Sequence, residues 1–245
     1  MIDSRLAAAA LIAFALAGIA EAQPKWTRYE PVAVAFPKRS NDPALTVFRS
    51  ILADIARKKD RKALEKYVAR DFFWERDFGG GYEKKKGAFR NFAAALELDA
   101  ENATGWRNLT AFADQFTGPH EKKKGVFCGP PAPRYDEKTF AALVARTESD
   151  VYEWGYPAHA HVIAREQGAH GSPEAGKLAM NFVYTDLAAR GENFDPAKDW
   201  TPVILPDGKR AFVQPGELLT LLDPRLCYVK RNGNWLIAGY VGGGD

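Results

Sequence analysis

Apolar positions recur with a helical period over residues 42–147. Asp42-Pro43 predicts a helix start, because a carboxylate can cap the first amide groups and proline fits the first helical position. Apolar side chains then follow every three or four residues, which is typical of one buried helical face. The positions on this face are Leu45, Phe48, Ile51, Leu52 and Ile55. Similar faces recur up to Val144, so the pattern predicts a mostly helical domain over residues 42–147.

Short apolar runs separated by turn signals replace the helical period over residues 148–245. Asp207-Gly208 and Asn232-Gly233 predict β-hairpins, because two-residue hairpin turns favour positive φ at their central positions. Short strands with frequent turns are typical of a small barrel rather than of alternating strands and helices. The expected fold class is therefore α+β, with helices first and a β-barrel after residue 147.

The first 41 residues form two further segments. Residues 1–22 combine one arginine, the 15-residue apolar run Leu6–Ala20 and the small-x-small sequence Ala20-Glu21-Ala22, which is typical of a secretory signal peptide. A membrane-spanning helix needs about 20 apolar residues, and we expect no such segment in the mature chain. Residues 23–41 are rich in proline and polar groups and predict an extended lead-in. We expect a periplasmic or secreted protein, cleaved near Ala22.

Charge is distributed unevenly along a nearly neutral chain. The net charge of +3 gives no support for a nucleic-acid partner. Residues 42–147 hold 20 Lys and Arg against 15 Asp and Glu, a net charge of +5, whereas residues 148–245 hold 9 against 13, a net charge of −4. Opposite charges of this kind favour docking of the two parts, although ordinary surface scatter gives the same pattern.

Two cysteines, Cys128 and Cys227, are the only ones in the chain. An even number of cysteines in an exported protein permits one disulfide. The sequence alone leaves two alternatives open, which are a bridge between them and two separately buried thiols.

The β half resembles the bacterial SH3-like domain in the order of its segments. The most specific of these segments is Asp199–Leu219 (DWTPVILPDGKRAFVQPGELL), which matches the closing hairpin of that family. Trp200, the Asp207-Gly208 turn and Phe212 stand at positions of its pattern, whereas Ala211 replaces the usual glycine. The resemblance covers residues 148–222 and implies a small barrel, with an extra hairpin after it. The whole chain also resembles envelope proteins of alphaproteobacteria that carry a helical domain before such a barrel.

A second resemblance gives a different architecture. Residues 52–74 together with Asn232–Val241 are similar to the first helices and last strand of the ketosteroid-isomerase-like cone fold. This alternative implies a single sheet with strands from both halves of the chain and a small-molecule cavity.

Aromatic residues give the best candidate binding site. Tyr152, Trp154, Tyr156 and Trp200 cluster in the β half, and aromatic grooves on SH3-like barrels hold extended peptides. Barrel-core packing is the competing interpretation and is favoured for Trp154 and Trp200, and also for the nearby Phe212. Tyr152 and Tyr156 are therefore the expected surface residues.

Two other constellations could carry chemistry. Glu75 and Asp77 lie among aromatic residues and could act as an acid and base pair, although neighbouring cations could equally neutralise them. His159 and His161 would share one face of a strand, but this spacing alone does not indicate a metal site. Nucleophile-elbow, P-loop and dinucleotide-binding motifs are absent from the sequence.

These observations give two main hypotheses. The first is an exported, noncatalytic envelope protein without a cofactor, whose SH3-like domain binds a peptide, peptidoglycan or another envelope protein. The second is an enzyme or small-molecule carrier with a cavity near Glu75 and Asp77. A purely structural role of the barrel is a third possibility.

Overall fold

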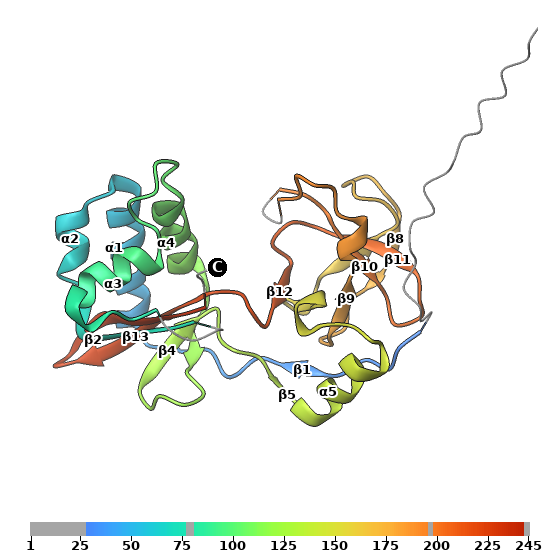
Figure 1. Ribbon diagram of the computed structural model, residues 1–245, viewed down its shortest axis with the longest axis horizontal. Helices are drawn as coiled ribbons and strands as arrows, with labels where there is room; N and C mark the ends of the chain where they lie inside the picture. Colours follow the sequence, from blue (N-terminus) through green and yellow to red (C-terminus); the bar gives the residue numbers. More distant parts are fainter. Residues whose placement is uncertain (1–27, 77–80, 196–197, 243–245) are drawn as a thin grey trace, which may run out of the picture.

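The computed structural model describes residues 28–76, 81–195 and 198–242. The signal segment expected at residues 1–22 lies outside these ranges, as do residues 23–27 of the lead-in. The described chain has an α+β fold with two units side by side (Figure 1). We call them the helix–sheet unit, in which helices pack on a five-stranded sheet, and the β unit, which contains a seven-stranded sheet.

The helix–sheet unit begins with a capped helix, as predicted. α1 (Pro43–Lys58) follows Asp42, whose carboxylate accepts a hydrogen bond from the Ala44 amide at 2.8 Å. Four of the five predicted face positions are buried, whereas Ile51 is 38 % exposed. The following helices are α2 (Arg61–Glu65), α3 (Ala88–Ala95) and α4 (Thr104–Asp114).

The five-stranded sheet combines strands from distant parts of the chain. Its order is β2-β14-β13-β4-β3, with β2 parallel to β14 and the other pairs antiparallel. The strands are β2 (Val68–Glu75), β3 (Gly118–Pro119), β4 (Val126–Gly129), β13 (Arg225–Arg231) and β14 (Asn234–Val241). The predicted Asn232-Gly233 turn joins β13 to β14, and both of its residues have positive φ.

The two faces of this sheet have different surroundings. Phe72, Tyr228 and Ile237 face the helices and join one large core with α1, α3 and α4. Val126, Cys128, Cys227 and Val229 belong to a smaller cluster on the opposite face. Polar groups of the loop between β3 and β4 approach this second face, as described below.

This arrangement differs from a helical domain followed by a separate β domain. Residues 42–147 supply three strands to the sheet, in addition to their helices. The terminal hairpin was expected beside the β-barrel, but its hydrogen-bonded neighbours are β2 and β4 of the helix–sheet unit. Both faces of β13 and β14 carry apolar residues, and in the helix–sheet unit these join a core cluster on each side of the sheet.

The β unit contains seven strands in the order β12-β6-β9-β10-β11-β7-β8, and its sheet is not closed into a barrel. The expected hairpin is present as β10 and β11, with Gly208 at φ +90° in its turn. The strands are β6 (Trp154–Pro157), β7 (Ile163–Arg165), β8 (Glu174–Lys177), β9 (Val183–Thr185), β10 (Thr201–Ile204), β11 (Arg210–Val213) and β12 (Leu218–Thr220). Neighbouring strands of this sheet pair antiparallel throughout the described residues.

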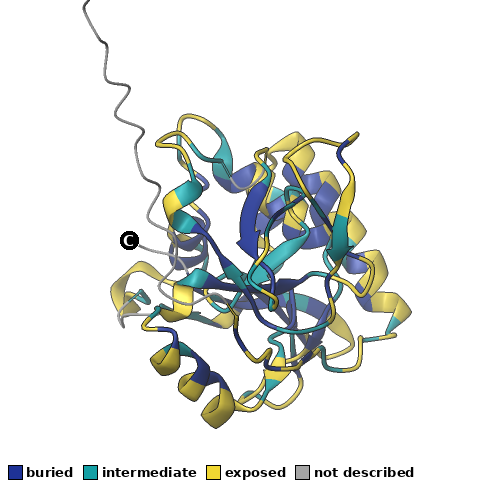
Figure 2. Cartoon of the chain, turned by 90° about the vertical axis from the view of Figure 1, so that its right-hand side faces the viewer, coloured by how far each residue is buried: buried dark blue, intermediate teal, exposed yellow. Residues whose placement is uncertain are grey.

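An additional layer covers one side of the β unit. It consists of the lead-in with β1 (Val34–Ala35), its partner β5 (Arg134–Tyr135) and α5 (Glu137–Arg146). Tyr29, Phe140 and Phe182 pack there around the Trp154 ring, with Tyr29 and Trp154 ring centroids 5.1 Å apart. Figure 2 shows the exposed helices and loops around the buried strands.

The chain passes between the two units at residues 37–41, 130–133 and 221–224. These segments define the junction of the units. In the part of the chain that the structure describes, no helix combines the length and apolar character needed to cross a membrane.

Candidate functional site

The β10–β11 hairpin presents aromatic side chains on its outer side. Ala211 and Val213 are buried in the β-unit core, whereas Phe212 between them is only partly buried, because successive side chains of a strand point to opposite faces. Trp200 is also partly buried and directly precedes β10. We call Trp200, Phe212, His170 and Gln214 the aromatic face.

The loop between β7 and β8 folds against this face. A Cβ atom on Gly168 would lie 2.9 Å from the Trp200 Cβ, so only glycine allows this close approach. The His170 and Trp200 rings lie 5.3 Å apart, and His170 Nδ1 lies 3.3 Å from Gln214 Nε2. Hydrogen bonds from Arg165 and Gln167 to Ser172 close the loop. The aromatic face is thus built on rigid neighbouring strands.

The other aromatic candidates lie elsewhere. Trp154 is fully buried, as the core interpretation expected, and its Nε1 donates to Ser149 Oγ at 2.8 Å. Tyr152 is 52 % exposed, in agreement with the expected surface position. Tyr156 was also expected at the surface, but it is 2 % exposed because the lead-in and β5 cover this side of the sheet. The four candidates therefore do not form one groove.

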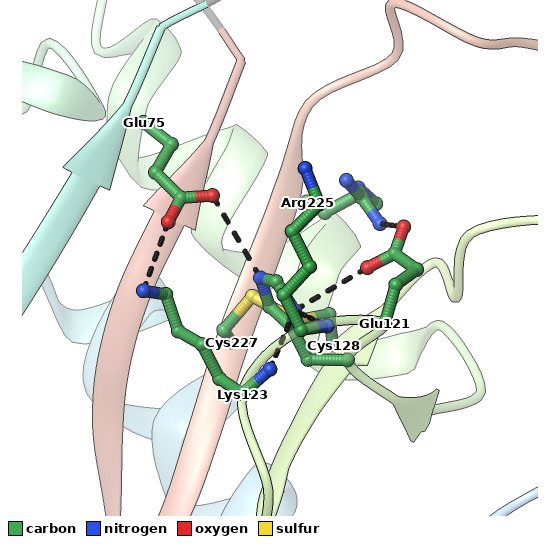
Figure 3. Close-up of a disulfide and its surroundings, with 8 residues drawn as sticks. Glu75, Glu121, Lys123, Cys128, Arg225 and Cys227 are labelled. Atoms are coloured by element: carbon green, nitrogen blue, oxygen red, sulfur yellow. Dashed lines mark hydrogen bonds and ion pairs between the residues drawn. A yellow bond between two sulfur atoms is a disulfide. The ribbon is translucent and has the colours of Figure 1, made fainter.

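The proposed acid and base pair is only partly described. Asp77 lies outside the described residues. Glu75, at the end of β2, binds Lys123 Nζ at 3.0 Å, which supports the neutralised interpretation (Figure 3). Its other oxygen lies 3.8 Å from His120 Nε2.

His120 is a buried histidine that the sequence analysis did not select. Its Nδ1 accepts hydrogen bonds from the amides of Lys122 and Lys123, at 3.0 and 3.3 Å, so this nitrogen carries no proton. Its Nε2 is buried without a hydrogen-bond partner. Burial lowers the pKa of His120, although Glu121 and Glu75 oppose this shift. The lowered pKa favours the neutral ring, whose Nδ1 holds the loop between β3 and β4 in place.

Two further contacts surround His120. Arg225 at the start of β13 binds Glu121 at 2.7 Å (Figure 3). Burial alone would raise the pKa of Glu121, but a backbone hydrogen bond and Arg225 outweigh it and lower this pKa.

The disulfide Cys128–Cys227 joins β4 and β13 at directly opposed positions, which confirms the bridge that the sequence permitted.

A pocket of about 200 Å³ lies at the junction of the units. The helix–sheet unit contributes Glu121 and Arg225, and the β unit contributes Tyr135, Glu137 and Tyr156. Asp223 of the crossing segment also lines it, as do proline and leucine side chains. We call this the junction pocket. Sequence reasoning missed it because its residues come from segments up to about 100 positions apart.

The histidine pair gives no sign of a metal site. His159 contacts Glu217 at 3.8 Å, and both His159 and His161 are exposed. Within residues 28–76, 81–195 and 198–242, no three His, Cys, Asp or Glu side chains come together as metal ligands.

Comparisons with family models, with curated proteins and with solved structures find no match to this chain.

Proposed function

We propose that this chain is an exported, noncatalytic binding protein whose β unit is an SH3-like module that holds an extended peptide. The ligand would be a cell-wall peptide or a segment of an envelope protein. The observation that carries the proposal is the aromatic face, where Trp200 and Phe212 point away from the core of the β unit. Both side chains stay partly exposed although the loop between β7 and β8 packs against them.

The succession of strands supports an SH3-like module. A first strand, β6, pairs with the last strand, β12, and the hairpin β7–β8 lies between them in sequence. The meander β9–β10–β11 follows, and β11 also pairs with β7. The loop of the β7–β8 hairpin reaches Trp200 through Gly168 and His170, so a long loop frames the aromatic face.

The chemistry of this face favours a peptide. Trp200 and Phe212 offer flat apolar surfaces, on which an extended chain gains burial and stacking. His170 and Gln214 beside them can exchange hydrogen bonds with peptide groups. The disulfide supports an oxidising compartment, in agreement with export.

The test measures binding of the purified mature protein to isolated peptidoglycan sacculi and to their released stem peptides. Trp200→Ala should weaken binding by about 1–3 kcal/mol, as for an interface hot spot. Tyr152→Ala, which removes an exposed aromatic side chain outside the face, is the matched control and should bind normally. Thermal melts accompany both variants. Equal binding by Trp200→Ala and wild-type protein would reject the aromatic face as the site.

A small-molecule carrier is the second candidate function. The five-stranded sheet takes strands from both halves of the chain, as the cone-fold alternative expected. A groove of about 400 Å³ lies beside α1, with Val47 60 % exposed and with Tyr67 and Trp235 in its lining. This volume suits a small apolar ligand. A carrier predicts no capture of the wild-type protein by sacculi, so the same experiment separates the two functions.

A further inference from the structure

We propose that the junction pocket binds the ammonium group of a small organic amine. This site is distinct from the aromatic face and does not depend on the function proposed for it. Its volume of about 200 Å³ would hold six or seven waters at about 30 Å³ each, which is room for an alkylamine of a few carbons.

The charges of the pocket favour a cation. Arg225 and Glu121 form an ion pair at 2.7 Å, so their charges cancel. Glu137 and Asp223 remain, and neither has an ion-pair partner among the contacts found in the described residues. The carboxylate of Asp223 accepts hydrogen bonds from the Thr220 amide at 2.6 Å and from its hydroxyl at 3.2 Å. These neutral donors leave the negative charge uncompensated.

Asp223 is partly buried in this pocket. This burial raises the pKa of its carboxyl group, against the effect of the two Thr220 hydrogen bonds. An ammonium group beside Asp223 would supply the missing opposite charge, and a charge pair is stronger when water is excluded. Tyr156 lies near Asp223. Burial is the main cause of the raised pKa of the Tyr156 hydroxyl, and the negative charge of Asp223 adds to this shift.

The remaining walls suit the carbon chain of an amine. The rings of Tyr135 and Tyr156 line the pocket, together with proline and leucine side chains. Aromatic rings attract cations and also pack against methylene groups. A divalent metal ion would need three or more converging ligands, and no such group is present in the described residues. An organic cation fits these walls better.

The pocket lies between elements of both units, so an amine bound there would contact both. Glu121 precedes β4 and Arg225 begins β13, whereas Glu137 and Tyr156 belong to α5 and β6. Amine binding should therefore stabilise the placement of the units relative to each other.

The experiment titrates the full mature chain with n-pentylamine at low ionic strength and follows backbone amide NMR signals. n-Pentanol and pentanoate, which have the same carbon chain, are the controls. We expect saturable shifts for pentylamine alone, located at residues 133–137 and 220–225. Shifts of equal size with pentanol would show apolar binding only and would overturn the proposal, as would the absence of saturable shifts.

Substitutions test the role of the carboxylates. Asp223→Asn keeps an oxygen for the Thr220 amide but removes the charge. It should weaken the binding of pentylamine at least about tenfold, or about 1.4 kcal/mol. Glu137→Gln, at the start of α5, should also weaken pentylamine binding and serves as a second variant if Asp223→Asn does not fold. Glu65→Gln, on the exposed surface of α2, is the matched control. Unchanged affinity in folded Asp223→Asn or Glu137→Gln would overturn the assignment.

Discussion

The helix–sheet unit and the β unit differ in how far apart their strands lie in the sequence. In the first, β2 pairs with β14, so residues from both halves of the chain form one sheet. In the second, all seven strands come from residues 154–220. The disulfide lies in the first unit, and the aromatic face lies in the second. The unit with distant strands is thus cross-linked, whereas the local one carries the aromatic face that we propose for binding.

Of the changes that test this comparison, removal of the disulfide should have the largest effect on the stability of the helix–sheet unit. The bridge joins residues 99 positions apart, and the chain-entropy model gives about 4–5 kcal/mol for a loop of this length. The double substitution Cys128→Ala and Cys227→Ala should lower the free energy of unfolding of the helix–sheet unit by this amount. Urea unfolding followed by circular dichroism measures the change.

A reducing agent provides the control for this prediction. It should destabilise the wild-type protein and leave the double variant unchanged. An unfolding midpoint that is the same in wild type and variant would contradict a stabilising role of the bridge.

A cavity in the helical core should have the next largest effect. Leu52 of α1 is fully buried, and Leu52→Ala should cost about 3 kcal/mol, within the range for buried leucines. Val47→Ala on the same helix is the matched control, since Val47 is mostly exposed, and it should change stability by less than about 0.5 kcal/mol. Thermal melts compare the variants. Similar losses for both would contradict the packing described for α1.

Acidification should have the smallest effect, and it should act on the helix–sheet unit. Burial lowers the pKa of His120 below its ordinary value of 6.5, so the unfolded chain takes up a proton at higher pH than the folded chain. This contribution to stability is present above pH 6.5 and is lost as the pH falls toward the lower folded pKa. Melts from pH 7.5 to 5 should show this loss in the wild-type protein.

His120→Gln tests the origin of the pH effect. Glutamine can accept from the same backbone amides but does not titrate, so this variant should lose less stability over the same pH range. His159→Gln, at an exposed histidine, should keep the wild-type profile. An unchanged pH profile in His120→Gln would assign the effect to other groups.

Local signals in the sequence predicted elements well. Asp42-Pro43 predicted the start of α1, because the cap and the helical residue lie side by side in the chain. Asp207-Gly208 predicted the β10–β11 turn for the same reason. Both depend on backbone preferences of neighbouring residues, which the sequence displays directly.

Features that depend on distant residues were missed. Residues 68–75 were not predicted as a strand, because their strand partner in the sheet is β14, more than 150 residues further along. Tyr156 is buried by the lead-in, which no pattern around Tyr156 reveals. His120 gains part of its environment from Glu75, and Asp223 from Tyr156, and both neighbours are distant in the sequence. The sequence named Trp200 as an aromatic candidate but favoured core packing for it, and it contained no local signal of the junction pocket.

The pairing of β2 with β14 also has a consequence for biosynthesis. β14 is the neighbour of β2 in the described part of the sheet, and a ribosome makes residues 234–241 more than 150 residues after β2. Until then, β2 lacks this partner for its backbone groups, and unpaired strands are prone to aggregate. Nascent chains should therefore need protection of residues 68–75 until residues 234–241 have been made, and a chain that stops before Asn234 should be removed by proteases rather than accumulate.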